Sequence, residues 1–299
     1  MWRVVLMGLL WWGTLAQAGT AAMTYIYPPP ESGADRRMDY YWVLMRAALQ
    51  VTEAQWGPFV LEPSSVVMNA DRSQILLSNA ETITTLVRVT SREREAAMRA
   101  VRIPLDKGLT GYRLFLIRQQ TQGALAQVRS LDDLRRFSIG QGSNWVDTKV
   151  LRGAGFTVET APTYESLFFM LEAGRFDLFS RGINEIAREW EDRHASLPQL
   201  AVERHLMLYY PLPRYFFFAP TPEGERLANR VQQGLERLMR NGQFERLYRE
   251  FKRQILVDLP VAGRRLFRLE NPELPPQTPL HRPELWDNLA TERQAPTAR

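Results

Sequence analysis

The chain has 299 residues, of which 45% are hydrophobic and 24% charged, enough to build one or two globular domains with proper cores. The formal net charge is +5, but basic and acidic residues alternate, so the sequence does not indicate a nucleic-acid partner. The lack of cysteine excludes a disulfide framework, thiol catalysis and cysteine metal sites, and the three histidines have no ligand spacing. We therefore expect neither a metal site nor a cofactor.

Residues 1–18 have the pattern of a secretory signal peptide. Arg3 supplies the positive charge, residues 4–15 form the apolar run, and Ala16-Gln17-Ala18 is a small-x-small cleavage site. The apolar run is too short to span a membrane. We expect a soluble, exported, periplasmic protein, with an uncleaved N-terminal anchor as the alternative.

The next part of the chain alternates between strand and helix patterns. Strands are predicted at residues 23–27, 59–62 and 83–89, and helices at residues 36–52 and 73–77. The run Pro28-Pro29-Pro30 forces an extended loop after the first strand. The order of these elements predicts an α/β unit.

A second unit of the same order lies in residues 130–182. Its predicted strands are 137–140, 156–160 and 176–179, and its predicted helices are 145–152 and 164–172. This alternation predicts a parallel sheet with right-handed crossovers. After the first strand, Gly142 permits a tight turn and Ser143 or Asn144 can cap the helix, whose free N–H groups suit an anion.

Two extended segments bracket this second unit, so we infer that it is inserted into the first. They are residues 112–118, a β-prone alternation, and residues 206–219, an aromatic run interrupted by two prolines. We place the first lobe in residues 19–112 and 219–289, and the second lobe, with its hinge crossings, in residues 113–218. Two lobes joined by two strands permit closure of a cleft around a ligand.

The C-terminal part of the chain begins with a helical pattern at residues 222–253, broken at Asn241-Gly242. Its apolar stripe favours core packing. Residues 271–289 are rich in proline, and we expect them to be extended and to wrap the first lobe. We expect residues 290–299 to be disordered.

Several motifs occur together in this order: Leu131-x-x-Leu134, Ile139-Gly140-x-Gly142-Ser143, Gly174-Arg175-Phe176-Asp177 and Asn241-Gly242-x-Phe244. With them the chain resembles the bacterial periplasmic solute-binding proteins of family 3, the amino-acid-binding type. More narrowly, it is similar to an exported branch of this group. The resemblance implies a type II periplasmic-binding-protein fold, an α/β fold whose second lobe is inserted into the first through two hinge strands. Such a fold closes on a small solute.

The resemblance also implies ligand-binding positions. Arg94 stands where the family's arginine grips a ligand carboxylate, a task that suits a bidentate guanidinium; a surface ion pair with neighbouring acids is the alternative. Gly142 and Ser143 stand at the helix N-terminus that also receives the carboxylate. Tyr27 stands where an aromatic residue often covers the ligand, although simple packing would also explain it.

One departure from the family pattern concerns the acid that binds the amino group of the ligand. Its position is Gly182 in this chain, and Arg181 stands beside it. A buried ammonium would meet a cation there, so an ordinary amino acid is disfavoured unless Glu185 turns inward. Arg94, Arg181 and the helix N-terminus together favour an anionic or zwitterionic solute. Further candidate contacts are Glu31, Trp145 and Glu185.

We therefore expect a monomeric solute-binding protein without catalytic residues. It would present a small-molecule solute to an inner-membrane ABC transporter or to a sensor ectodomain. One alternative is an exported enzyme similar to the cyclohexadienyl dehydratases, with Glu31, Asp39 or Glu185 as its general acid. Another is a sensory or scaffold protein that contacts a membrane receptor through the Pro-rich residues 274–286.

Overall fold

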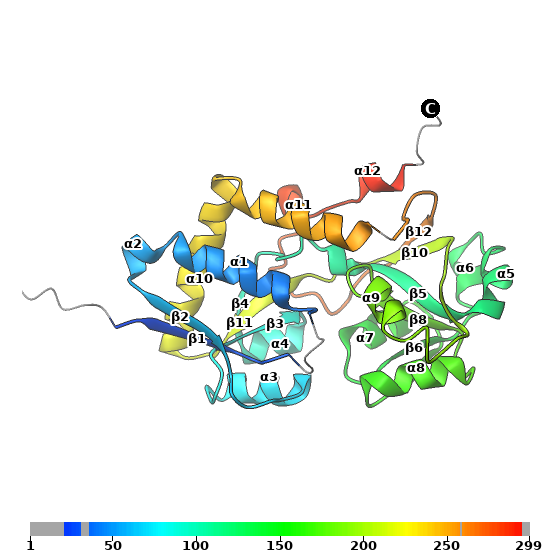
Figure 1. Cartoon of the computed structure of the whole chain (residues 1–299), viewed down its shortest axis with the longest axis horizontal. Helices are drawn as coiled ribbons and strands as arrows, with labels where there is room; N and C mark the ends of the chain where they lie inside the picture. Colours follow the sequence, from blue (N-terminus) through cyan, green and yellow to red (C-terminus); the bar gives the residue numbers. More distant parts are fainter. Residues whose placement is uncertain (1–20, 31–35, 258, 295–299) are drawn as a thin grey trace, which may run out of the picture.

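The computed structural model describes residues 21–30, 36–257 and 259–294. The predicted signal peptide and Glu31 lie outside these residues. Two α/β lobes lie side by side along the long axis of the molecule (Figure 1), which confirms the predicted fold class. No helix within the described part of the chain is long and apolar enough to cross a membrane.

The first lobe contains two small sheets joined edge to edge. Its strands are β1 (Met23–Tyr27), β2 (Phe59–Pro63), β3 (Thr85–Val89), β4 (Arg99–Val101) and β11 (Arg214–Phe218). β1 and β2 run parallel, whereas β11 lies between β3 and β4 and is antiparallel to both. Thr84 links the two sheets, because its hydroxyl accepts the Ile26 amide at 2.8 Å and its own amide donates to the Ile26 carbonyl at 2.9 Å.

Helices cover the first lobe and bury its core. They are α1 (Asp39–Gln50), α2 (Glu53–Trp56), α3 (Ala70–Ser78), α4 (Arg92–Ala97), α10 (Pro222–Arg240) and α11 (Gln243–Leu256). The apolar stripe of α10 is buried against α1, as the helical pattern predicted. Gly234 lets the two helices approach closely, since a Cβ there would lie 2.2 Å from the Ala48 carbonyl oxygen. Gly242, with φ of 75°, supplies the turn between α10 and α11.

The second lobe is built on one seven-stranded sheet. Its strands are β5 (Tyr112–Arg118), β6 (Ile139–Gly142), β7 (Val158–Ala161), β8 (Leu178–Gly182), β9 (Leu200–Val202), β10 (Leu206–Tyr209) and β12 (Arg265–Arg268). β7, β6 and β8 are parallel neighbours, which confirms the parallel sheet predicted from residues 130–182. The flanking helices are α5 (Gln122–Leu125), α6 (Leu131–Leu134), α7 (Val146–Gly153), α8 (Tyr164–Glu172) and α9 (Ile186–Glu191), and short 3₁₀ turns lie at η1 (Leu109–Gly111) and η2 (Gln119–Thr121).

The return crossing between the lobes ends earlier than the sequence analysis placed it. The sequence placed residues 113–218 in the second lobe, but β11 belongs to the sheet of the first lobe. The return crossing therefore ends before Arg214. Pro211 and Pro213 explain the break between β10 and β11, because proline has no N–H to donate to a ladder.

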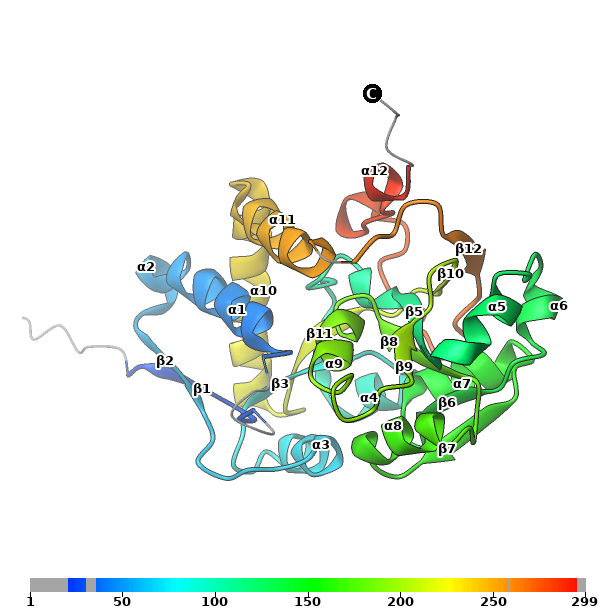
Figure 2. The same ribbon diagram turned by 45° about the vertical axis from the view of Figure 1, so that its right-hand side comes forward.

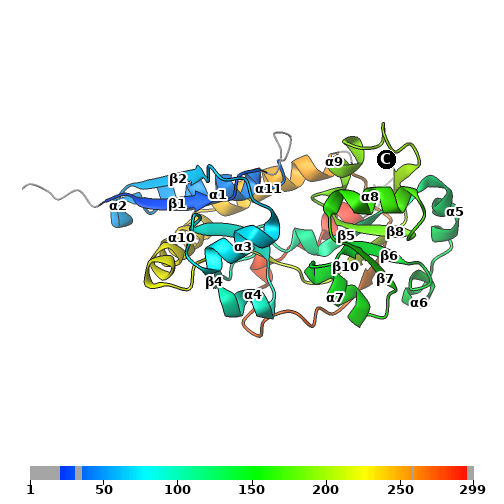
Figure 3. The ribbon, with the colours of Figure 1, turned by 90° about the horizontal axis from the view of Figure 1, so that it is seen from below.

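The C-terminal segment crosses both lobes, although the sequence assigned residues 219–289 to the first. β12 pairs in parallel with β10 and so covers an edge of the second sheet. Glu273 then contacts both lobes: its carbonyl accepts the Arg92 amide at 3.0 Å, and its carboxylate lies 3.2 Å from Lys149 of α7. Figure 3 shows this stretch passing α4 and α7.

The last described residues are held to the molecule rather than free. After η3 (Pro283–Leu285), the Asp287 carboxylate accepts the Tyr248 hydroxyl at 2.6 Å and Lys252 Nζ at 2.7 Å, both from α11. Leu289 is fully buried in the second lobe's core. The helical turn α12 (Ala290–Arg293) follows, where the sequence predicted disorder.

Candidate functional site

A cleft of about 690 Å³ lies between the two lobes. The first lobe contributes the loop after β1 together with parts of α1, α3, β3 and α4. The second lobe contributes the turn after β6, the start of α7, the loop before α8 and the end of β8. Figure 2 shows α3 and α8, one from each lobe, at the same edge of the molecule. The predicted site residues that the structure describes all line this cleft, and Glu31 lies outside the described residues.

Arg94 lies in the first-lobe wall of the cleft and has only neutral direct partners there. The Ser91 hydroxyl caps α4 by accepting the Arg94 amide at 3.1 Å, which fixes the start of the helix. The Arg94 Nε donates to Gln74 Oε1 at 2.8 Å, and Nη1 donates to the Val89 carbonyl. Burial lowers the pKa of Arg94 from its ordinary value. Among the described residues no carboxylate forms an ion pair with Arg94.

A second arginine lies on the same wall. Arg88 Nη2 donates to the Ser73 hydroxyl at 2.8 Å, and Nη1 donates to the Val87 carbonyl at 2.8 Å. Arg88 directly precedes Val89 in β3, and the Val89 carbonyl accepts a hydrogen bond from Arg94. The two guanidinium groups therefore lie close together on this wall of the cleft.

The facing wall is the turn between β6 and α7. Gly142 is buried, and a Cβ there would lie 2.4 Å from the Trp145 ring, so only glycine lets the indole pack across the turn. The Gly142 carbonyl accepts the Thr148 hydroxyl at 2.8 Å. The helix begins at Val146, and its N-cap is Trp145, not Ser143 or Asn144 as the sequence suggested. No side chain caps this end of α7, and the Thr148 amide donates to the carbonyl of the N-cap residue Trp145 at 3.1 Å.

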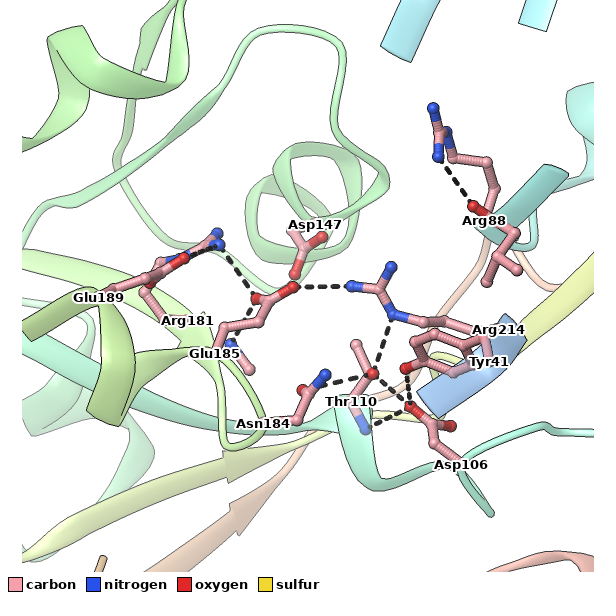
Figure 4. Close-up of polar contacts among 12 residues, drawn as sticks. Tyr41, Arg88, Asp106, Thr110, Asp147, Arg181, Asn184, Glu185, Glu189 and Arg214 are labelled. Carbon is pink, nitrogen blue, oxygen red and sulfur yellow. Dashed lines mark hydrogen bonds and ion pairs between the residues drawn. The ribbon is translucent and has the colours of Figure 1, made fainter. Parts of the chain in front are cut away.

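Arg181 lies on the second-lobe side, but its charge is already neutralised. Its guanidinium donates to both oxygens of Glu189, at 2.7 and 2.5 Å, and Nη2 lies 3.1 Å from Glu185. The side chain is almost completely buried. The expectation that Arg181 grips the solute's anion therefore needs correction, because two carboxylates take the donors that an anion would need. Figure 4 shows these three residues in a row.

Glu185 turns inward and lines the cleft. Its Oε1 accepts Arg214 Nη2 at 2.7 Å, and its Oε2 accepts the Gly182 amide at 3.1 Å (Figure 4). Oε2 lies 3.0 Å from the point where a Cβ on Gly182 would stand. Burial alone would raise the pKa of Glu185, but the charges of Arg181 and Arg214 outweigh burial and hold it well below its ordinary value.

The floor of the cleft is a set of matched charges. Arg113 pairs with Asp147 at 3.0 Å, and the hinge residue Arg214 donates through Nε to Thr110 at 3.1 Å. Thr110 in turn hydrogen-bonds to Asp106, which is fully buried and whose pKa is raised by that burial. Figure 4 shows Thr110 between Arg214 and Asp106.

Two aromatic residues form an apolar wall in the first lobe. Tyr27 stacks on Trp42 of α1, with ring centres 4.2 Å apart and an angle of 23° between the planes. The sequence predicted Tyr27 but not Trp42. The available signal was a large aromatic residue off the core-facing stripe of the predicted helix. A comparable signal for Arg113 was one charged residue within an apolar strand.

The mouth of the cleft is bridged by direct contacts between the lobes. The Asn144 side-chain amide donates to Asp71 Oδ2 at 3.1 Å. The Arg37 guanidinium carbon lies 5.5 Å from the Tyr164 ring centre. The lobes therefore meet across the cleft as well as at the hinge.

Solved structures of the same fold are found at low sequence identity. An ancestral arginine-binding protein bound to arginine has a TM-score of 0.53 and 15% identity, covering 76% of this chain and 97% of that one. A histidine kinase sensor domain with similarity to periplasmic binding proteins has a TM-score of 0.53 and 17% identity, with coverages of 77% and 96%. An ancestral amino-acid-binding protein, a precursor of cyclohexadienyl dehydratase, has a TM-score of 0.51 and 13% identity, with coverages of 76% and 94%.

No protein-family model matches the chain, and no curated protein matches its sequence. The solved structures are covered almost completely, whereas about a quarter of this chain lies outside each match, so the chain adds segments to a shared fold. The match of both lobes confirms the fold that the motifs predicted. The protein has the two-lobed fold of the periplasmic amino-acid-binding proteins.

Proposed function

We propose that this protein binds a small carboxylate-bearing solute, anionic or zwitterionic, in the cleft between its lobes. The observation that carries the proposal is Arg94, a partly buried guanidinium whose direct partners are neutral. A buried charge is costly unless it is paired, and a solute carboxylate would supply the missing partner. The planar guanidinium suits a carboxylate in particular.

The charge of the whole cleft supports the same class of solute. Its described lining residues include seven arginines but four carboxylates. The carboxylates Glu185 and Asp147 neutralise arginines of the floor, whereas Arg94 on the first-lobe wall has no ion-pair partner among the described residues. A zwitterion could place its ammonium near Glu185 while its carboxylate meets Arg94. The stacked rings of Tyr27 and Trp42 would cover an apolar part of such a solute.

A panel of ligands tests this proposal. The twenty L-amino acids and small mono- and dicarboxylates would be screened for a rise in the unfolding temperature of the wild-type protein, Arg94→Ala and Arg92→Ala. Arg92 is the matched control, because it removes the same charge from the same helix but lies outside the cleft lining. We expect at least one carboxylate to stabilise the wild type and Arg92→Ala but not Arg94→Ala.

Either of two outcomes would contradict the proposal. In the first, no member of the panel stabilises the wild type. In the second, Arg94→Ala responds as strongly as Arg92→Ala, so Arg94 does not contact the solute.

The signal-peptide pattern and the fold both bear on the role after binding. Residues 1–18 suggest that the protein is exported to the periplasm, and the fold is shared with binding proteins and with a sensor domain. We infer that the closed protein presents its solute to an inner-membrane transporter or to a receptor. The cleft does not favour the dehydratase alternative through Glu185, since a carboxyl whose pKa is held low is a poor general acid at neutral pH.

A further inference from the structure

The side chain of Arg181 is enclosed by aromatic rings at the second-lobe side of the cleft. Its guanidinium carbon lies 4.9 Å from the ring centre of Trp145, 5.0 Å from that of Phe179 and 5.5 Å from that of Tyr164. Three ring faces within 6 Å of one cation form an aromatic cage of the kind that binds organic cations. Trp145 and Tyr164 also line the cleft, so the cage adjoins the space where a solute would bind.

Carboxylates complete this cage. Glu189 accepts two parallel hydrogen bonds from Arg181, from Nε at 2.7 Å and from Nη2 at 2.5 Å, which is bidentate recognition of a guanidinium. Glu185 adds a third contact at 3.1 Å. The Tyr164 hydroxyl donates to Glu189 Oε1 at 2.7 Å and so orients the carboxylate. The cage is therefore built for the shape of a guanidinium as well as for its charge.

We propose that Arg181 is the internal occupant of a guanidinium subsite and that it determines which solutes the cleft accepts. A solute whose side chain ends in a guanidinium or an ammonium would be drawn to these rings and carboxylates, but Arg181 already fills them. The cleft of the wild-type protein therefore excludes solutes with cationic side chains, and removal of Arg181 opens the subsite. The exclusion of solutes rests on the proposed function, whereas the occupancy of the cage by Arg181 does not.

The competing explanation for the burial of Arg181 is a purely structural ion pair. In that case the stability of the lobe would depend on opposite charges and not on the shape of the guanidinium group. The two explanations differ in what a free guanidinium ion can do. If the cage recognises the group, the free ion should restore a variant that lacks Arg181. If Arg181 stabilises the protein only through its charge or as a covalently attached residue of β8, the free ion should not restore the variant.

A matched pair of double variants separates these cases. Arg181→Ala/Glu185→Gln and Arg181→Ala/Glu189→Gln each remove one arginine and one carboxylate from the same cluster, so they have the same net charge. The first keeps the bidentate carboxylate of Glu189, and the second loses it. The unfolding temperature of each variant would be measured without any solute. One series would contain millimolar guanidinium chloride, far below denaturing concentrations, and the other the same concentration of sodium chloride.

We expect guanidinium to raise the unfolding temperature of the variant that keeps Glu189, saturably, relative to sodium. Its apparent affinity should be weaker by about thirtyfold or more in the variant that loses Glu189, as for the loss of one partner of a buried charge pair. Neither variant responding, or both responding equally, would overturn the proposed cage. Because no solute is present, this result is independent of whether the cleft binds a carboxylate.

The exclusion of solutes has its own test on the wild-type protein. Titration with L-arginine and with agmatine should show no binding to the wild type, whereas Arg181→Ala, which keeps both Glu185 and Glu189, should bind at least one of them. Wild-type protein that binds L-arginine as well as it binds a neutral amino acid would overturn the assigned role of Arg181 in specificity.

Discussion

Replacing Glu185 with glutamine keeps the shape of a buried side chain and removes its charge. The residue is 9% exposed, and its carboxylate lies 2.7 Å from Arg214 and 3.1 Å from Arg181. In the variant, Arg181 keeps the carboxylate of Glu189. Arg214 is left without an ion-pair partner among the described residues.

The size of the effect follows from these partners. Breaking a buried ion pair by removing one partner costs about 3–5 kcal/mol, because the other charge stays buried. Since Arg181 retains a second carboxylate, we expect the lower end, about 3 kcal/mol of unfolding free energy. For a chain of this size, that corresponds to a fall of roughly 6–12 °C in unfolding temperature.

Urea denaturation at neutral pH, followed by tryptophan fluorescence and circular dichroism, would measure this loss. Glu284→Gln is the control, since that carboxylate is 58% exposed and pairs with Arg282 at 2.8 Å on the surface. The control should lose much less, because a solvent-exposed ion pair contributes little to stability. A loss for Glu185→Gln no larger than that of the control would refute the argument that the buried charges depend on Glu185.

The same carboxylate predicts a pH dependence of stability. The pKa of Glu185 in the folded state lies below its ordinary value of 4.5, so on acidification the unfolded chain takes up this proton first. The stabilisation is complete above about pH 4.5 and is lost as the pH falls toward the folded-state pKa. Glu185→Gln should therefore have a flatter acid limb than the wild type in urea denaturation over acidic to neutral pH. Parallel acid limbs would contradict this.

Two further predictions concern the C-terminal segment and the mouth of the cleft. Asp287→Asn weakens the contacts with Tyr248 and Lys252 and should cost about 1–3 kcal/mol in urea denaturation; unchanged stability would mean that these contacts do not fix the segment. Asn144→Ala removes the hydrogen bond to Asp71 between the lobes, worth about 0.5–1.5 kcal/mol of closure. Small-angle scattering of solute-free protein should then show a larger radius of gyration, and an unchanged radius would argue against a role in closure.

Local sequence patterns predicted the framework of the fold well. Alternation of strand and helix in residues 130–182 predicts a parallel sheet, and three neighbouring parallel strands are found. Residues 206–219 were predicted as one extended run interrupted by two prolines, and those prolines separate β10 from β11. These features depend on neighbours in sequence, so they can be predicted from one chain.

The ion pairing of Arg181 could not be predicted from local sequence patterns. Arg181 is neutralised by Glu189, eight residues later, because α9 follows β8 after a short turn and brings that carboxylate back to the arginine. An isolated arginine beside a glycine gives no sign of such pairing. The course of the C-terminal segment could not be predicted for a similar reason, because β12 pairs with β10, which lies about sixty residues earlier in the chain.

The most direct test of the central claim is a calorimetric double-mutant cycle between Arg94 and the solute carboxylate. The solute that most stabilises the wild type and its carboxamide analogue would each be titrated into wild-type protein and Arg94→Ala. We predict a coupling free energy of at least about 2 kcal/mol, roughly thirtyfold in affinity, because both changes remove the same charged contact. Additive effects of the two changes, with no coupling, would show that Arg94 does not hold the carboxylate and would contradict the account.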